Sequence, residues 1–184
     1  MRTILSAGLL AVVFLFCFGC LNTSAQTTDQ SEMYIDTTYQ KINEPFFFDS
    51  TGVSIIPPAY YMPFVQNGKT GFIHKGAGST IQVEILDGMI YTLIAGSLTA
   101  EELLKQNAVL KEHYTILTNN GKSADFFIVG FSIKALDKDV EYERLMLLTG
   151  DHKKTIWVSA NYPVMAKSVV FNVLKESLLS VDFE

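Results

Sequence analysis

Residues 113 to 162 repeat one pattern, in which short segments of alternating or β-branched apolar residues are separated by turn-forming residues. Such segments form strands, because successive side chains point to opposite faces of a sheet. Turns as short as Asn120-Gly121 connect strands that pair antiparallel. The pattern therefore predicts a four-stranded antiparallel meander, with strands at 113–119, 124–136, 140–150 and 154–162.

Further strand signals precede the meander. Two apolar runs flank Asp49-Ser50-Thr51-Gly52, which is typical of a β-hairpin. Strands are also expected at 70–76 and 79–88, because Ile81, Val83 and Ile85 alternate with polar residues in the second of them.

Two other stretches have weaker patterns. Residues 59–70 are interpreted as an irregular connection, because Pro57-Pro58 cannot donate to a strand ladder and stops the strand before it. Residues 33–42 are either a first edge strand or an ordered lead-in to the domain.

Two segments have helical signals. Thr99 and Glu102 form a capping box, in which each side chain accepts a hydrogen bond from a backbone N–H near the helix start, and we expect a helix from Thr99 to about Lys111. Pro163 suits the first turn of a closing helix, because no N–H is needed there. The closing helix is expected to bury an apolar stripe of Met165, Val169, Val170, Leu174, Leu178 and Val181.

These elements predict an α+β fold: a mainly antiparallel sheet, containing the meander, with two principal helices packed on it. The chain lacks the alternation of strand and helix that builds a doubly wound nucleotide-binding sheet. We therefore expect no dinucleotide cofactor, and no other cofactor motif is present.

Three stretches resemble a known family. They are FFFDSTGVSIIPPAYY, LTAEELLKQNAVL, and the meander through Gly121 and Tyr162-Pro163 with a closing helix that ends LKESLLSVDF. In these patterns the chain resembles the PsbP-like family, whose fold also covers the Ran-binding nuclear-import factor and bacterial DcrB-type periplasmic proteins. The resemblance covers about residues 45–184. It implies a largely non-enzymatic, partner-binding or accessory role, with no shared catalytic residues to transfer.

The N-terminal residues resemble an export signal. A single Arg2 precedes a long uncharged apolar run, and Thr23 and Ala25 suit the small-residue positions of a signal-peptidase site. We expect cleavage after Ala25, which makes 1–25 a signal peptide. A competing route is lipidation at Cys20, which follows a glycine in a partial lipobox. Both routes place the product outside the cytoplasm, in the periplasm or extracellular space or anchored to the envelope.

Beyond the signal peptide, the chain divides into two parts. Residues 26–44 are a polar tether or lead-in strand, and 45–184 are a single α+β PsbP-like domain. Both cysteines lie at or before Cys20, so this domain has no disulfide, thiolate zinc site or cysteine nucleophile. The formal net charge of −5 without a basic cluster argues against nucleic-acid binding, and membrane contact is expected only with lipidation at Cys20.

No group of polar residues predicts catalysis or metal binding. The three histidines, His74, His113 and His152, lack partners at metal-ligand spacing and are interpreted as surface residues. The acidic cluster of Asp137, Asp139, Glu141 and Glu143 misses the calcium-loop pattern and is interpreted as a solvated sheet edge.

The candidate binding surface is the aromatic stretch containing Tyr60, Tyr61 and Phe64. Aromatic residues in a loop give a large contact area at low entropic cost, although the same stretch could instead pack as a lid over the sheet. Trp157 lies on the strand face opposite Ile156, either in a second core layer or as an exposed anchor. Sequence alone leaves both alternatives open.

From these features we expect a non-enzymatic exported accessory or binding protein of the bacterial envelope, acting through a protein partner or a small ligand. The alternatives are a periplasmic hydrolase whose site assembles only in the folded protein, and a lipid-anchored assembly factor of the envelope.

Overall fold

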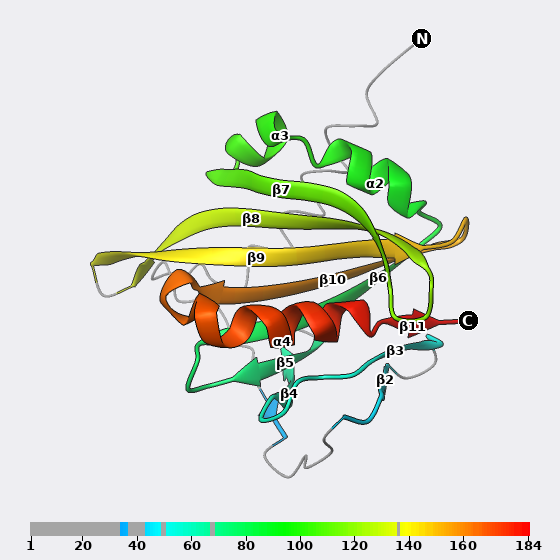
Figure 1. Cartoon of the computed structure of the whole chain (residues 1–184), viewed down its shortest axis with the longest axis horizontal. Helices are drawn as coiled ribbons and strands as arrows, with labels where there is room; N and C mark the ends of the chain where they lie inside the picture. Colours follow the sequence, from blue (N-terminus) through cyan, green and yellow to red (C-terminus); the bar gives the residue numbers. More distant parts are fainter. Residues whose placement is uncertain (1–33, 37–42, 49–50, 67–68, 136) are drawn as a thin grey trace.

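Most of the fold is one large antiparallel sheet (Figure 1). The computed structural model describes residues 34–36, 43–48, 51–66, 69–135 and 137–184. Within them, eight strands pair in the order β1-β4-β5-β6-β10-β9-β8-β7. In chain order they are β1 (Tyr34–Ile35), β4 (Met62–Gln66), β5 (Lys69–His74), β6 (Ser79–Asp87), β7 (Ala108–Leu117), β8 (Ser123–Ala135), β9 (Lys138–Gly150) and β10 (Lys154–Pro163). The predicted α+β class is confirmed.

Strands β7 to β10 form the predicted meander. Each pairs antiparallel with the next along the chain, and β10 also pairs with β6. Alternation along β10 places Ile156 and Tyr162 on one face and Trp157 on the other. The sheet therefore has two apolar faces, and each face is covered by helical structure.

Helix α4 (Lys167–Leu179) lies across one face, after a 3₁₀ turn, η1 (Val164–Ala166) (Figure 1). Its Val170, Leu174 and Leu178 pack against the larger core, as expected. The predicted stripe is wrong at Met165 and Val169, whose side chains are exposed. Met165 lies in the turn η1, before α4 begins at Lys167. Val169 lies within α4, but it is five residues before the buried Leu174 and therefore about 140° around the helix from it.

The other face is covered by α2 (Tyr91–Ser97) and α3 (Ala100–Leu104). A second core lies beneath these short helices, and Trp157 is completely buried in it. Of the two alternatives for Trp157, the structure shows the second core layer.

A second, small sheet brings a hairpin from the N-terminal part of the described residues together with the last strand of the chain. It contains β2 (Phe46–Phe48), β3 (Val53–Ile55) and β11 (Asp182–Phe183), with β3 in the middle. The pairing of β2 with β3 confirms the expected hairpin.

The expected helix from Thr99 to about Lys111 is wrong beyond Leu104. One half of the predicted capping box is present, because the Thr99 hydroxyl accepts a hydrogen bond from the Glu102 N–H at 3.2 Å. The other half is absent among the described residues, since the Thr99 N–H donates to the Ser97 carbonyl and the Glu102 carboxylate accepts from Lys105. The helix stops because Asn107 adopts a positive φ of 58°, which a helix cannot continue through. The chain then enters β7, so residues from Ala108 onward are strand.

The expected irregular connection at 59–70 is also wrong, because Met62–Gln66 and Lys69–His74 form paired strands. Pro63 lacks an N–H but lies next to the short outermost strand β1, where its carbonyl accepts a hydrogen bond from the Asp36 N–H at 2.9 Å. The N–H and the carbonyl of a strand residue point to the same side, so the donor that Pro63 lacks would face this edge of the sheet and not β5.

In the part of the chain that the structure describes, no helix is long and apolar enough to cross a membrane. The apolar segment at 1–25, with Cys20 and Ala25, lies outside the described residues.

Candidate functional site

The most strongly organised polar group in the described residues surrounds Glu143, a buried carboxylate on β9. Its Oε1 accepts a hydrogen bond from Lys111 Nζ at 2.7 Å, and its Oε2 accepts one from the Tyr162 hydroxyl at 2.6 Å. Lys167 Nζ lies 2.8 Å from Oε2 and 3.1 Å from Oε1. Both carboxylate oxygens are therefore occupied. We call these four residues the Glu143 cluster.

Four elements bring the cluster together. Tyr162 on β10 lies directly opposite Glu143 in the strand register, and Lys167 is the first residue of α4. Lys111 comes from β7, which is separated from β9 by β8. The cluster thus fixes the start of α4 against the sheet.

Lys111 reaches across β8 because of two local features. A β-bulge interrupts the register of β7 between Leu110 and Glu112, so Lys111 is the extra residue. Opposite Glu143 on β8 is Gly130, and a Cβ built there would lie 2.6 Å from Lys111 Cε. Because Gly130 has no side chain, the Lys111 side chain has room to pass over β8 at this position.

Electrostatics hold Glu143 in its charged form. Burial alone would raise its pKa, but the hydrogen bonds from Lys111, Lys167 and Tyr162 outweigh burial and lower the pKa to about 2. Burial and the neighbouring carboxylate raise the pKa of Tyr162 far above its ordinary value. Neither group exchanges a proton near neutral pH.

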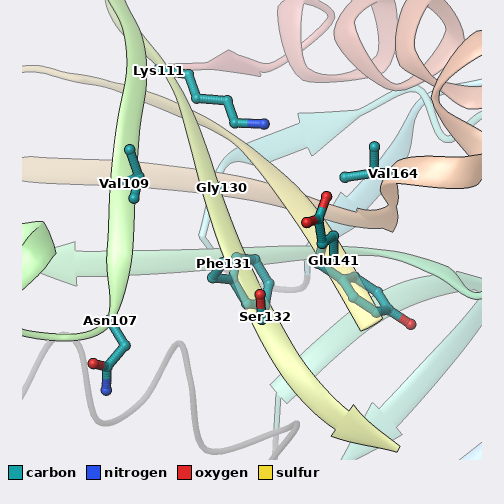
Figure 2. Close-up of a pocket in the computed structure, with 9 residues that line it drawn as sticks. Asn107, Val109, Lys111, Gly130, Phe131, Ser132, Glu141 and Val164 are labelled. Carbon is teal, nitrogen blue, oxygen red and sulfur yellow. The ribbon is translucent and has the colours of Figure 1, made fainter. Parts of the chain in front are cut away.

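A hollow of about 440 Å³ lies beside the cluster (Figure 2). Figure 2 shows Lys111 and Glu141 pointing into it, with Val109 on one side of the view and Val164 on the other. We call this hollow the Lys111 pocket, and it is lined by Asn107, Val109, Lys111, Gly130, Phe131, Ser132, Glu141, Tyr142 and Val164. Its volume lies within the range of small-molecule sites.

A second hollow of similar volume lies between α4 and the segment around Pro57-Pro58. Its serine hydroxyls are engaged within the fold: Ser177 donates to the Ile56 carbonyl at 2.7 Å, and Ser180 accepts from the Ile56 N–H at 2.8 Å. These groups hold the chain in place. The Lys111 pocket is therefore the stronger candidate site.

The structure separates the three residues of the predicted aromatic surface. Tyr60 is 81% exposed, whereas Tyr61 and Phe64 are only 4% and 3% exposed. The hydroxyl groups of Tyr61 and Ser79 share a hydrogen bond of 2.5 Å, and the Phe64 ring packs over Gly71. Two of the three side chains are thus part of the interior, and the stretch forms strand β4 within the sheet, which is neither of the two predicted arrangements.

The histidines do not converge. His113 bonds Asp125 at 2.9 Å and stacks on Phe127, while His74 Nδ1 accepts a hydrogen bond from the Ala77 N–H at 3.0 Å. Among the described residues, no group of three or more His, Cys, Asp or Glu side chains could hold a metal ion.

The interpretation of the acidic cluster as a solvated edge is wrong for Glu143. Asp137, Asp139 and Glu141 are exposed, but Glu143 is buried. A signal was present in the sequence, because Glu143 alternates in phase with Leu145 and Leu147, which face the larger core. By contrast, no pattern in the sequence indicated that Lys111 and Lys167 would lie beside Glu143.

No protein-family model matches the sequence, and no curated protein matches it. A crystal structure of a protein from Bacteroides thetaiotaomicron is similar, with a TM-score of 0.48 and 16% identity over 74% of this chain, and the chain spans about half (47%) of that protein's length. The solution structure of cyanobacterial PsbP from Synechocystis matches with a TM-score of 0.54 and 9% identity, over 89% of this chain and 99% of that protein. On this match and the topology above, the chain has a PsbP-like α+β fold.

Proposed function

We propose that this chain is a non-enzymatic binding protein that holds a small ligand in the Lys111 pocket. The observation that supports this most directly is the hollow itself, into which an ammonium and a carboxylate, those of Lys111 and Glu141, both point. Pockets that combine apolar walls with a few placed polar groups are the usual form of ligand sites.

The chemistry of the Glu143 cluster supports binding over catalysis. A general acid or base needs a pKa near the working pH and a free oxygen for the proton it transfers. Glu143 has a pKa of about 2 and both its oxygens accept hydrogen bonds. Its role in this proposal is to hold Lys111 at the pocket.

We further propose that the chain is an exported bacterial member of the PsbP-like family, acting as an accessory protein of the envelope. The support is the family-like fold, which extends over 99% of cyanobacterial PsbP, together with the export-type residues at 1–25. Intact-mass analysis of protein from an exporting host tests the second part. Mature chain beginning at Gln26 supports cleavage after Ala25, acylated Cys20 supports the lipid-anchored form, and retention of residues 1–25 would contradict both.

The ligand site can be tested by NMR. Isotope-labelled protein is mixed with the low-molecular-mass fraction of the host envelope, and backbone amide shifts are followed. We expect changes centred on Val109, Gly130 and Val164, which line the pocket. Saturating changes confined to the hollow near Pro57-Pro58, or no changes at any amide, would contradict the proposed site.

A second candidate is binding of a protein partner on the outward side of α4. Val169 and Val173 are exposed one turn apart on α4, and the exposed Met165 lies in the turn η1 just before the helix, so three apolar side chains are exposed close together in sequence. A photo-reactive residue placed at Val169 should crosslink a specific protein in the host envelope. A matched probe at Lys153, on an exposed turn, is the control.

A further inference from the structure

We propose that the Lys111 pocket selects a small dipolar ion, that is, a molecule with one ammonium and one carboxylate, such as a free aliphatic amino acid. This inference rests on the proposed function and names the class of ligand for the same site. It follows from the way charges are placed at the pocket.

Lys111 is suited to bind the carboxylate of such a ligand. Its ammonium has three donors, and one of them is engaged by Glu143 Oε1 at 2.7 Å. The side chain is 42% exposed and points into the hollow (Figure 2), so the remaining donors face the space that a ligand would fill. Its position is fixed by the bulge and by Gly130.

Glu141 is suited to bind the ammonium group. It lies two residues before Glu143 on β9, so its side chain emerges on the same face of the sheet. Within the described part of the chain, no hydrogen bond or ion pair engages its carboxylate. Glu141 therefore presents a negative charge to the pocket, beside the positive charge of Lys111.

The sum of charges favours a ligand with no net charge. Among the residues that line the pocket, Lys111 provides one positive charge and Glu141 provides one negative charge. A bound anion or cation would leave one charge in excess at the site, whereas a dipolar ion would not. Its two charged ends would each meet an opposite charge.

The walls of the pocket favour an aliphatic side chain. Val109 and Val164 face the hollow from two separate elements, β7 and η1. A volume of about 440 Å³ exceeds what a single amino acid needs, so a short peptide could also be accommodated. The experiment therefore uses the smaller ligand as its probe.

The test compares L-leucine with two derivatives, N-acetyl-L-leucine, which lacks the ammonium, and L-leucinamide, which lacks the carboxylate. Dissociation constants, expected in the millimolar range for so small a ligand, are measured from amide shifts on the folded protein. We expect each derivative to bind about 10-fold more weakly than leucine, because each loses one charge-assisted contact.

Two exposed-site variants locate the effect. In Glu141→Gln, the affinity for leucine should fall by about 5- to 10-fold, while the affinity for N-acetyl-L-leucine should not change. The dissociation constants of the two ligands should then be nearly equal. Asp139→Asn, a carboxylate lost two residues away on the same strand, should leave all three affinities unchanged. Both positions are exposed, so both variants should fold.

Equal binding of all three compounds at the pocket would overturn this inference while leaving the proposed function intact. Absence of any leucine-induced shift at the pocket would also overturn it, and the experiment with the envelope fraction would then decide the proposed function separately.

Discussion

Replacing Glu143 with glutamine keeps the shape of the side chain but removes the negative charge that Lys111 and Lys167 share. In the folded protein the pKa of this carboxyl falls from its ordinary value of 4.5 to about 2. Each pH unit between the two values is worth about 1.4 kcal/mol, so the charged form stabilises the fold by about 3 kcal/mol. The residue is only 3% exposed, so solvent screens little of this contribution.

The direction of the pH dependence follows from the lowered pKa. Because the folded protein binds this proton less tightly than the unfolded chain, the stabilisation is fully present above pH 4.5 and is lost as the pH falls towards 2. We therefore expect Glu143→Gln to be less stable than the natural protein by about 3 kcal/mol at pH 7. The difference should shrink steadily between pH 4.5 and pH 2.

Urea unfolding followed by tryptophan fluorescence, at pH steps from 7 to 2, measures both curves through the buried Trp157. Other carboxyl groups titrate in this range as well, so the difference between the two proteins is the informative quantity. Glu141→Gln, the same substitution at an exposed position of the same strand, should track the natural protein. A stability difference for Glu143→Gln that stays constant from pH 7 to pH 2 would refute the reasoning.

Three further tests probe separate parts of the fold. Stability is measured in each by urea unfolding followed by far-ultraviolet circular dichroism, because Trp157→Ala removes the single tryptophan of the sequence. Gly130→Ala should cost about 1–2 kcal/mol, because its methyl group would displace Lys111, and the pKa of Glu143 should rise when followed by carbon-13 NMR. Trp157→Ala should cost about 3–5 kcal/mol through the cavity left in the second core, whereas Tyr60→Ala should change stability by less than about 0.5 kcal/mol. Thr99→Ala should cost about 1 kcal/mol by removing the cap of α3, and Thr99→Ser should restore it.

The sheet was predictable from the sequence where local patterns determine it. Strands β8, β9 and β10 have strong alternation and turn residues between them, and each pairs with its neighbour along the chain. Helix α2 was not predicted because Ile90, at its N-cap, makes no side-chain capping bond, and the helix has only seven residues. Its stability comes from packing on the sheet, and packing leaves no local sequence signal.

The site depended on contacts that the sequence does not encode locally. Lys111 and Glu143 are 32 residues apart, and their contact requires the bulge in β7 as well as Gly130 on the strand between them. A bulge shifts all later residues of its strand to the opposite face, so alternation counted from the start of β7 assigns every residue after the bulge to the wrong face. The burial of Tyr61 and Phe64 was missed for a different reason, since Pro63 concealed strand β4.

The bulge at Lys111 also bears on how copies of this protein behave together at high concentration. Strand β7 is the outermost described strand on its side of the sheet, so its outer backbone groups could template another chain. Long, regular edges of this kind promote aggregation, whereas bulges and charged residues oppose it. The extra residue breaks the ladder near the middle of β7, where Lys111, Glu112 and His113 are all exposed. The irregularity that brings Lys111 to Glu143 thus also protects the sheet from growing by addition of a neighbouring molecule.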